Sequence, residues 1–150
     1  MIQMEQENSA LKLFVIMMRA HQRISDAVGA DVKGFGLNPT EFGVLELLYH
    51  KGDTPLQKIG EKILLASGSI TYVVDKLEGK GLLERKSCPS DRRVTYAGLT
   101  EQGRALIDDV FPKHAQMITD LFSVLSTEEQ QQAAELIKKL GHHSESIGKK

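Results

Sequence analysis

The chain has 150 residues, of which 41% are hydrophobic and 26% are charged, a composition typical of a globular domain rather than a disordered or fibrous protein. No segment approaches the ~18 consecutive apolar residues of a membrane-spanning helix, and the polar N-terminus lacks the pattern of a signal peptide. The formal net charge is −1, and the single cysteine excludes a disulfide within the chain and favours a cytoplasmic protein.

The first half of the sequence predicts four helices. Apolar residues recur at the spacing of one helix face over residues 8–28, and the glycines that follow predict a loop or weak helix end over residues 28–36. Asn38, Pro39 and Glu41 predict a sharp helix start, because Asn38 can cap, Pro39 suits the first turn and Glu41 completes a capping box. Two shorter helices are expected over residues 57–63 and 68–79.

The predicted helix over residues 68–79 has two contrasting faces. Its apolar stripe consists of Ile70, Val73, Val74 and Leu77. The opposite side carries small, hydroxyl-bearing and basic side chains, which suits close approach to another molecule.

The second half predicts a hairpin and two more helices. Strands are expected over residues 82–87 and 94–99, joined by the turn CPSDRR. A helix from Thr100 to about Leu125 should be kinked by Pro112, and the capping box from Ser126 to Glu129 starts a last helix. His142 and His143 are expected in a glycine-flanked tail after it.

Two short helices followed at once by a basic hairpin predict a winged helix-turn-helix, in a mainly α fold with a small β-hairpin wing. Residues 76–93 contain six basic and three acidic side chains, a local charge of +3 that leaves −4 for the remainder. The second helix of the pair is expected in a DNA major groove, with Arg92 and Arg93 uncompensated by acids and directed at phosphates and the minor groove. A solvated charged face, or a module that docks an acidic protein, is the alternative.

At this spacing, the segments LNPTEFGVLELL, SGSITYVVDKLEGKGLLER and DRRVTYAGLTEQG resemble the MarR family of bacterial transcriptional regulators over nearly the whole chain. The resemblance implies a homodimer in which residues 1–37 and 101–150 supply dimerisation helices and residues 38–100 form the DNA-binding lobe. It also implies binding to a pseudo-palindromic double-stranded operator, usually as a repressor. The segments TEFGVLELLYHKG and CPSDRRVTYAGLTEQG are most similar to the branch that responds to quinones, catechols and related phenols.

The resemblance and the helix pattern together predict the residues that contact DNA. In the wing, Asp91 is expected to orient the hairpin, Arg93 to enter the minor groove and Arg92 to contact a phosphate. Asp75 is expected to pair with Arg85, because a carboxylate there would repel phosphate. The full predicted set is Ser67, Ser69, Thr71, Tyr72, Lys76, Arg85, Lys86, Ser90, Asp91, Arg92 and Arg93.

Two further hypotheses concern an effector and an oxidant. Aromatic, methionine and histidine side chains could line an effector pocket, although at helical spacing they could equally be ordinary core. These residues are Phe14, Met17, Met18, His21, Phe42, Tyr49, Phe111 and His114. Cys88 could sense oxidants or quinones, with Arg85 and Lys86 lowering its pKa, or could be an unreactive thiol in a turn.

The sequence offers no catalytic or cofactor motif. Neither a phosphate-binding loop nor a nucleophile elbow is present, so we expect no enzyme and no cofactor. His142, His143 and Glu145 do not make a fixed metal-ligand set, and no metal is expected there.

Overall fold

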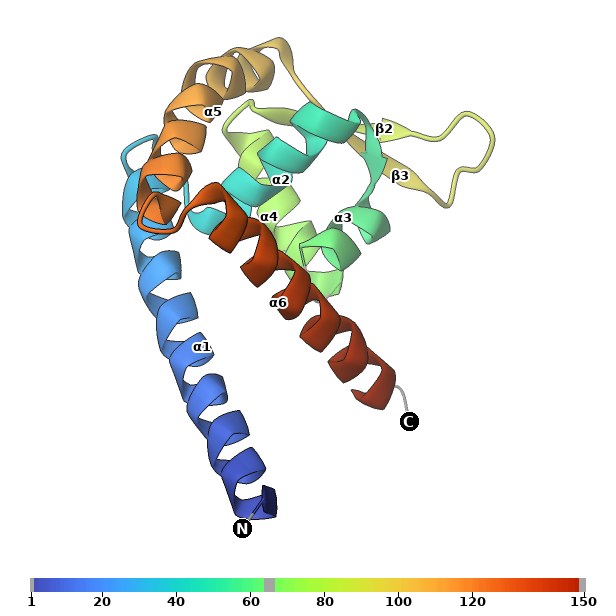
Figure 1. The fold of residues 1–150 in the computed structure, drawn as a ribbon. Coiled ribbons are helices and arrows are strands. Elements are labelled where there is room, and N and C mark those ends of the chain that lie inside the picture. Colours follow the sequence, from blue (N-terminus) through green and yellow to red (C-terminus); the bar gives the residue numbers. More distant parts are fainter. Residues whose placement is uncertain (1, 64–66, 149–150) are drawn as a thin grey trace. The chain divides into compact units, whose positions relative to one another are not determined.

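The computed structural model describes residues 2–63 and 67–148, which fall into two compact units, residues 1–114 and residues 115–150 (Figure 1). The first unit contains the helices α1 (Ile2–Lys33), α2 (Pro39–Lys51), α3 (Leu56–Lys62) and α4 (Ser67–Gly79). The long helix α5 (Glu101–Phe122) begins in the first unit and ends in the second, which also contains α6 (Thr127–Gly148). The predicted fold class, a winged helix-turn-helix flanked by long helices, is confirmed.

Helix α1 is longer than the sequence predicts. It continues through Gly29 to Lys33, so the loop expected over residues 28–36 is wrong for its first six residues. Burial explains the extension, because Val32 is fully buried and Val28 packs against the same core, which outweighs the low helix propensity of glycine. The turn that follows the helix passes through Gly36, whose φ of 80° is in the region that only glycine adopts freely.

The start of α2 is the predicted capping box. The Glu41 amide donates to Asn38 Oδ1 at 2.8 Å, and the Asn38 amide donates to Glu41 Oε1 at 2.9 Å. Glu41 is only 2% exposed, and Lys80 Nζ lies 2.8 Å from its second oxygen, Oε2. Burial raises the pKa of Glu41, but the hydrogen bonds from Lys80 and the Asn38 amide outweigh it and lower the pKa overall.

The hairpin consists of β2 (Leu83–Ser87) and β3 (Thr95–Leu99), and a third strand that the sequence analysis missed, β1 (Thr54–Pro55), completes the sheet. The strand order is β1-β3-β2, with every pair antiparallel. Leu83 pairs with Leu99 at the base of the hairpin and Ser87 with Thr95 near its tip. In Figure 1 the hairpin projects away from the helices as a wing.

Buried apolar side chains of the described residues lie between Val32 and Val110, around the helices α2 to α4 and the base of the wing. One glycine permits close backbone packing against this core. A Cβ at Gly103 would collide with the Leu82 carbonyl, so α5 passes the start of β2 at a distance that only glycine allows. Thr100 fixes the same junction, since its hydroxyl accepts from the Gly103 amide at 3.0 Å and donates to the Gly81 carbonyl at 2.6 Å.

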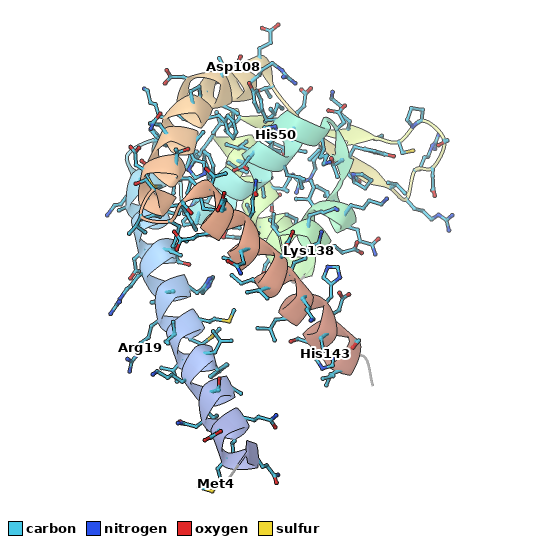
Figure 2. The ribbon with its side chains drawn as sticks, in the orientation of Figure 1. Met4, Arg19, His50, Asp108, Lys138 and His143 are labelled. Carbon is cyan, nitrogen blue, oxygen red and sulfur yellow. The ribbon has the colours of Figure 1, made fainter. Side chains whose placement is uncertain are left out.

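The second unit is a helical hairpin formed by the end of α5 and by α6. The predicted capping box of α6 is confirmed, with Ser126 and Glu129 exchanging hydrogen bonds of 2.9 and 3.1 Å. Gln130 Nε2 stabilises the turn between the helices by donating to the carbonyls of Phe122 and Leu125. Helix α6 continues through Gly141, so the predicted tail at His142 and His143 is wrong; Figure 2 shows His143 near the end of a regular helix.

No helix in the described residues is long and apolar enough to cross a membrane.

Candidate nucleic-acid interface

The predicted faces of α4 are both present. Ile70, Val73, Val74 and Leu77 are buried against the core, as expected from their spacing. On the other side Tyr72 is 67% exposed in the middle of the helix, and Ser69, Thr71 and Lys76 are also exposed. The side chain of Ser67 lies outside the described residues, although its backbone begins α4. An aromatic ring held in solvent on a rigid helix is suited to contact with a partner molecule.

Arg85 on β2 joins the wing to α4. Its guanidinium lies 2.6 Å from Asp75 Oδ1 and 2.6 Å from Glu78 Oε1, and its backbone amide also donates to Glu78. The predicted Asp75–Arg85 pair is therefore confirmed. The hydrogen bond to Asp75 raises the pKa of Arg85. Both ion pairs of the guanidinium are with carboxylates of α4. In this arrangement Arg85 positions the wing relative to α4, and its guanidinium is already occupied.

Lys86, another predicted DNA contact, also has an acidic neighbour. Its Nζ lies 3.0 Å from Asp53 Oδ2 and 3.7 Å from Glu84 Oε1. The hydrogen bond to Asp53 raises the pKa of Lys86. Asp53 also lies against Gly98 on β3, where a Cβ would collide with its carboxylate. The sequence analysis missed Asp53 because this pair depends on the unpredicted strand β1, which brings residue 54 beside residue 97.

The tip of the wing is organised by Asp91. Its carboxylate accepts from the Arg93 amide at 3.0 Å and from Arg93 Nε at 3.2 Å, and these hydrogen bonds lower the pKa of Asp91. The expectation that both arginines lack an acidic partner is therefore wrong for Arg93. The side chain of Arg93 nevertheless stays 90% exposed, because Asp91 contacts only the edge of its guanidinium formed by Nε and Nη2. Within the described residues Arg92 is exposed and forms no ion pair.

Cys88 lies at the start of the same loop, half-buried, with its Sγ 3.3 Å from Ser90 Oγ. Hydrogen bonds from the Ser90 side chain and backbone lower the pKa of the Cys88 thiol. The predicted direction of the shift is confirmed, but its predicted cause is wrong. Arg85 and Lys86 are engaged with acids, and Ser90 stabilises the thiolate instead.

Part of the predicted effector set gathers between α2 and α5. The rings of Phe42 and His114 lie 4.5 Å apart, and those of Tyr49 and Phe111 lie 6.0 Å apart. The Tyr49 hydroxyl donates to Asp108 at 2.7 Å, which raises the pKa of Tyr49. Figure 2 shows Asp108 and His50 at this end of the first unit.

His114 Nδ1 and Asp31 Oδ2 are both buried, 3.7 Å from each other, and neither has a hydrogen-bond partner among the described residues. Asp31 comes from the part of α1 that the sequence analysis assigned to a loop, so this neighbour of His114 was missed. The predicted effector residues on α1 have a different environment. Phe14 and Met18 are 60% and 48% exposed, His21 is exposed and Met17 is half-buried.

Comparison with known proteins gives consistent results. The model of the MarR family matches residues 37–95. The HTH-type transcriptional regulator MhqR of Bacillus subtilis is 56% identical over 141 residues, which cover 94% of this chain and 97% of the relative.

Solved structures share the fold over most of the chain. A MarR family regulator from Streptomyces coelicolor, Sco3205 in complex with DNA, has a TM-score of 0.83 at 20% identity and covers 89% of this chain and 86% of its own. BpsR of Bordetella bronchiseptica, whose DNA binding is regulated by 6-hydroxynicotinic acid, has a TM-score of 0.77 at 25% identity and covers 87% and 98%.

Proposed function

Because the chain belongs to the MarR family of transcriptional regulators, we propose that it is a cytoplasmic, homodimeric repressor that a small phenolic or quinone compound releases from a pseudo-palindromic operator. The observation that carries the DNA-binding part is the exposed side of α4. Tyr72 is 67% exposed there, between Ser69 and Lys76, while the rest of the helix is anchored in the core.

The proposed contacts follow from the geometry of α4 and the wing. Helix α4 enters the major groove, where Ser69, Thr71 and Tyr72 face base edges. The wing places Arg93 at the adjacent minor groove, and Asp91 fixes the direction of its guanidinium before DNA arrives. Ser90 and Arg92 contact the phosphate backbone, while Arg85 acts by holding the wing on α4.

The proposed dimer rests on apolar side chains that the single chain leaves exposed. On α1 these include Leu11, Phe14 and Val15, which are 59%, 60% and 42% exposed. On α6 they include Leu136, Ile137 and Leu140, which are 61%, 54% and 42% exposed. Rows of exposed apolar residues on long helices are costly in water, and a second copy would cover them. Two copies also supply two α4 helices for the two halves of a palindrome.

The proposed effector site is the aromatic cluster of Phe42, Tyr49, Phe111 and His114. Flat rings suit an aromatic ligand, and the unpartnered His114 Nδ1 suits a hydroxyl group. The regulation of BpsR by a hydroxylated aromatic acid supports this ligand class. Release requires only that the compound binds better to a dimer state whose α4 helices do not fit the operator.

Selection of bound duplexes from a random pool, followed by a panel of phenols and quinones, tests the proposal. We expect the full-length protein to enrich a dyad-symmetric sequence with an affinity that falls steeply with salt. We also expect one or more of the compounds to release that duplex. Enrichment of no sequence would contradict the DNA-binding role, and enrichment of asymmetric sites would contradict the dimer.

A further inference from the structure

A groove at the beginning of α2 is lined by three lysines. The DNA contacts proposed above account for only part of this set. It has a volume of about 440 Å³ and is formed by the end of α1, the first turn of α2 and the end of α4. Its lysines come from segments that are far apart in the sequence, Lys33 at the end of α1, Lys76 on α4 and Lys80 directly after α4. The remaining lining is mostly apolar or backbone, from Gly29, Gly36, Leu37, Asn38 and Pro39.

The groove carries excess positive charge. Its one carboxylate, Glu41, is buried and already bound by Lys80 at 2.8 Å and by the Asn38 amide at 2.9 Å. Lys80 also donates to the Gly36 carbonyl at 3.1 Å, so its ammonium group has a structural role. In the described part of the chain Lys33 and Lys76 have no ion pair, and both are exposed. Two unpaired cations therefore face the same groove.

The two edges of α4 differ in their charged residues, and this difference indicates where unpaired lysines could contact DNA. Asp75 and Glu78 lie along one edge, where Arg85 of the wing neutralises them. Ser69 and Lys76 lie along the other edge, since residues seven positions apart share a helix face, and Lys80 follows directly after the helix. A helix in the major groove has a phosphate strand along each edge, so the edge that carries Lys76 and opens into the groove meets the strand away from the wing.

We propose that this groove binds a backbone phosphate of the operator through Lys33 and Lys76. This inference rests on the proposed DNA-binding function and extends the contact surface beyond α4 and the wing, to the end of α1. Charge complementarity supports it, and so does continuity, because Lys76 belongs to both the groove and the exposed face of α4. The contact carries no sequence information; it fixes the position of α4 in its groove and adds to the salt dependence of binding.

The test measures the affinity of full-length protein for a duplex recovered by selection, over a series of salt concentrations. For wild type, log K should fall linearly with log salt concentration. Lys33→Gln and Lys76→Gln should each reduce the slope by up to about 0.9, the value for one fully lost phosphate contact, and weaken binding roughly fivefold at moderate salt. Lys51→Gln is the matched control, because Lys51 is an exposed lysine at the opposite end of α2 and should leave the slope unchanged.

Duplexes with one neutral methylphosphonate locate the contact. Neutralising the bound phosphate should weaken wild-type binding and should have a smaller effect on Lys33→Gln, in which only Lys76 remains to bind it, whereas other positions should affect both proteins equally. Lys33→Arg should restore the wild-type response, because it retains the charge. If the wild type binds the duplex but Lys33→Gln changes neither the slope nor the methylphosphonate pattern, the inference is wrong while the DNA-binding function stands.

A small anion is the other possible occupant. Inorganic phosphate, titrated at constant ionic strength, would then raise the Tm of the wild type and not that of Lys33→Gln, with an unchanged DNA salt slope. That result would overturn the proposed operator contact. If no duplex is enriched by the wild type at all, the proposed function itself fails, which is distinguishable from both outcomes.

Discussion

Helices α4 and α1 both carry apolar side chains at helical spacing, but α4 buries them within its own chain, whereas the first half of α1 leaves them exposed. Val74 and Leu77 on α4 are fully buried, whereas Leu11 and Phe14 on α1 are 59% and 60% exposed. The same sequence pattern therefore has two meanings. In the winged-helix segment, together with the ends of α1 and α5 that pack on it, the pattern builds a self-contained core, and in the first half of α1 and in α6 it predicts a partner chain. The difference supports the proposal that one part of this protein contacts DNA and another part brings two copies together.

The largest effect should follow from breaking the proposed dimer. Ile137→Asp places a charge in the exposed apolar row of α6, and we expect monomers whose operator affinity is lower by about 100-fold or more, because one half-site binds alone. Sedimentation and DNA titration measure the two effects. Lys138→Asp, the same new side chain on the adjacent residue labelled in Figure 2, should remain dimeric. Unfolding of the winged-helix segment together with the dimer would contradict the self-contained core.

Truncation of the buried stripe should have the next largest effect. Leu77→Ala removes a fully buried side chain and should lower the free energy of unfolding by about 2–5 kcal/mol. Chemical denaturation of variants that also carry Ile137→Asp measures the effects of Leu77→Ala and Leu11→Ala in the expected monomer. There Leu77→Ala should keep its full effect, while Leu11→Ala should change the free energy of unfolding by less than about 0.5 kcal/mol. A large effect of Leu11→Ala in the monomer would show that α1 packs within its own chain.

Glu41 should make the winged-helix segment sensitive to acid. Its pKa in the folded protein is below the ordinary value of 4.5, so the folded state binds a proton less readily than the unfolded state. The resulting stability is present above pH 4.5 and is lost as the pH falls through the lowered pKa. Glu41→Gln should therefore be less stable than wild type by about 1–3 kcal/mol at pH 7, and this gap should shrink toward pH 3. Denaturation across that range measures it, and a constant gap would contradict the assignment.

The exposed wing should affect binding without affecting folding. Arg93→Ala should weaken operator binding by about 1–3 kcal/mol, the scale of a lost charge-assisted contact in a groove. Because Arg93 is 90% exposed, the free energy of unfolding should change by less than about 0.5 kcal/mol. Arg92→Ala, at a proposed phosphate contact, should weaken binding to all sequences equally. An unchanged operator affinity for Arg93→Ala would contradict its placement in the minor groove.

The smallest effect is expected at Cys88. Ser90→Ala removes the hydrogen bond that lowers the pKa of the thiol, so alkylation near pH 7 should slow by roughly twofold. Cys88→Ser, which cannot be alkylated, supplies the baseline. If quinones release DNA from Cys88→Ser as they do from the wild type, the thiol has no sensing role.

Local signals in the sequence predicted much of the fold. The capping boxes of α2 and α6 are formed by neighbouring residues, so their side chains specify the helix starts without help from the rest of the chain. Helix ends were harder, because Gly29 and Gly141 are tolerated where the rest of the helix outweighs their cost. Strand β1 was missed because two residues that include a proline have no alternating pattern, and only pairing with β3 defines it.

The sequence predicted which residues line the candidate site, but it did not predict most of the contacts between their side chains. The exposed face of α4 follows from spacing alone, and so does the buried stripe behind it. The Asp75–Arg85 pair was predictable because a carboxylate facing phosphate needs a nearby cation. Lys86 with Asp53 and His114 with Asp31 join residues that are 33 and 83 positions apart, which no local pattern can reveal. Ser90 was predicted as a DNA contact, and its second role beside Cys88 depends on the geometry of the loop.

The double ion pair of Arg85 has a consequence for how operators can diverge. Because β2 is joined to α4 by ion pairs to two carboxylates, the protein sets the distance between the two DNA segments that α4 and the wing are proposed to contact in each half-site. Base substitutions can be accommodated by changing single side chains on α4. Inserting one base pair between the two segments would shift one of them by a tenth of a helical turn, and no side chain on this rigid frame could follow it.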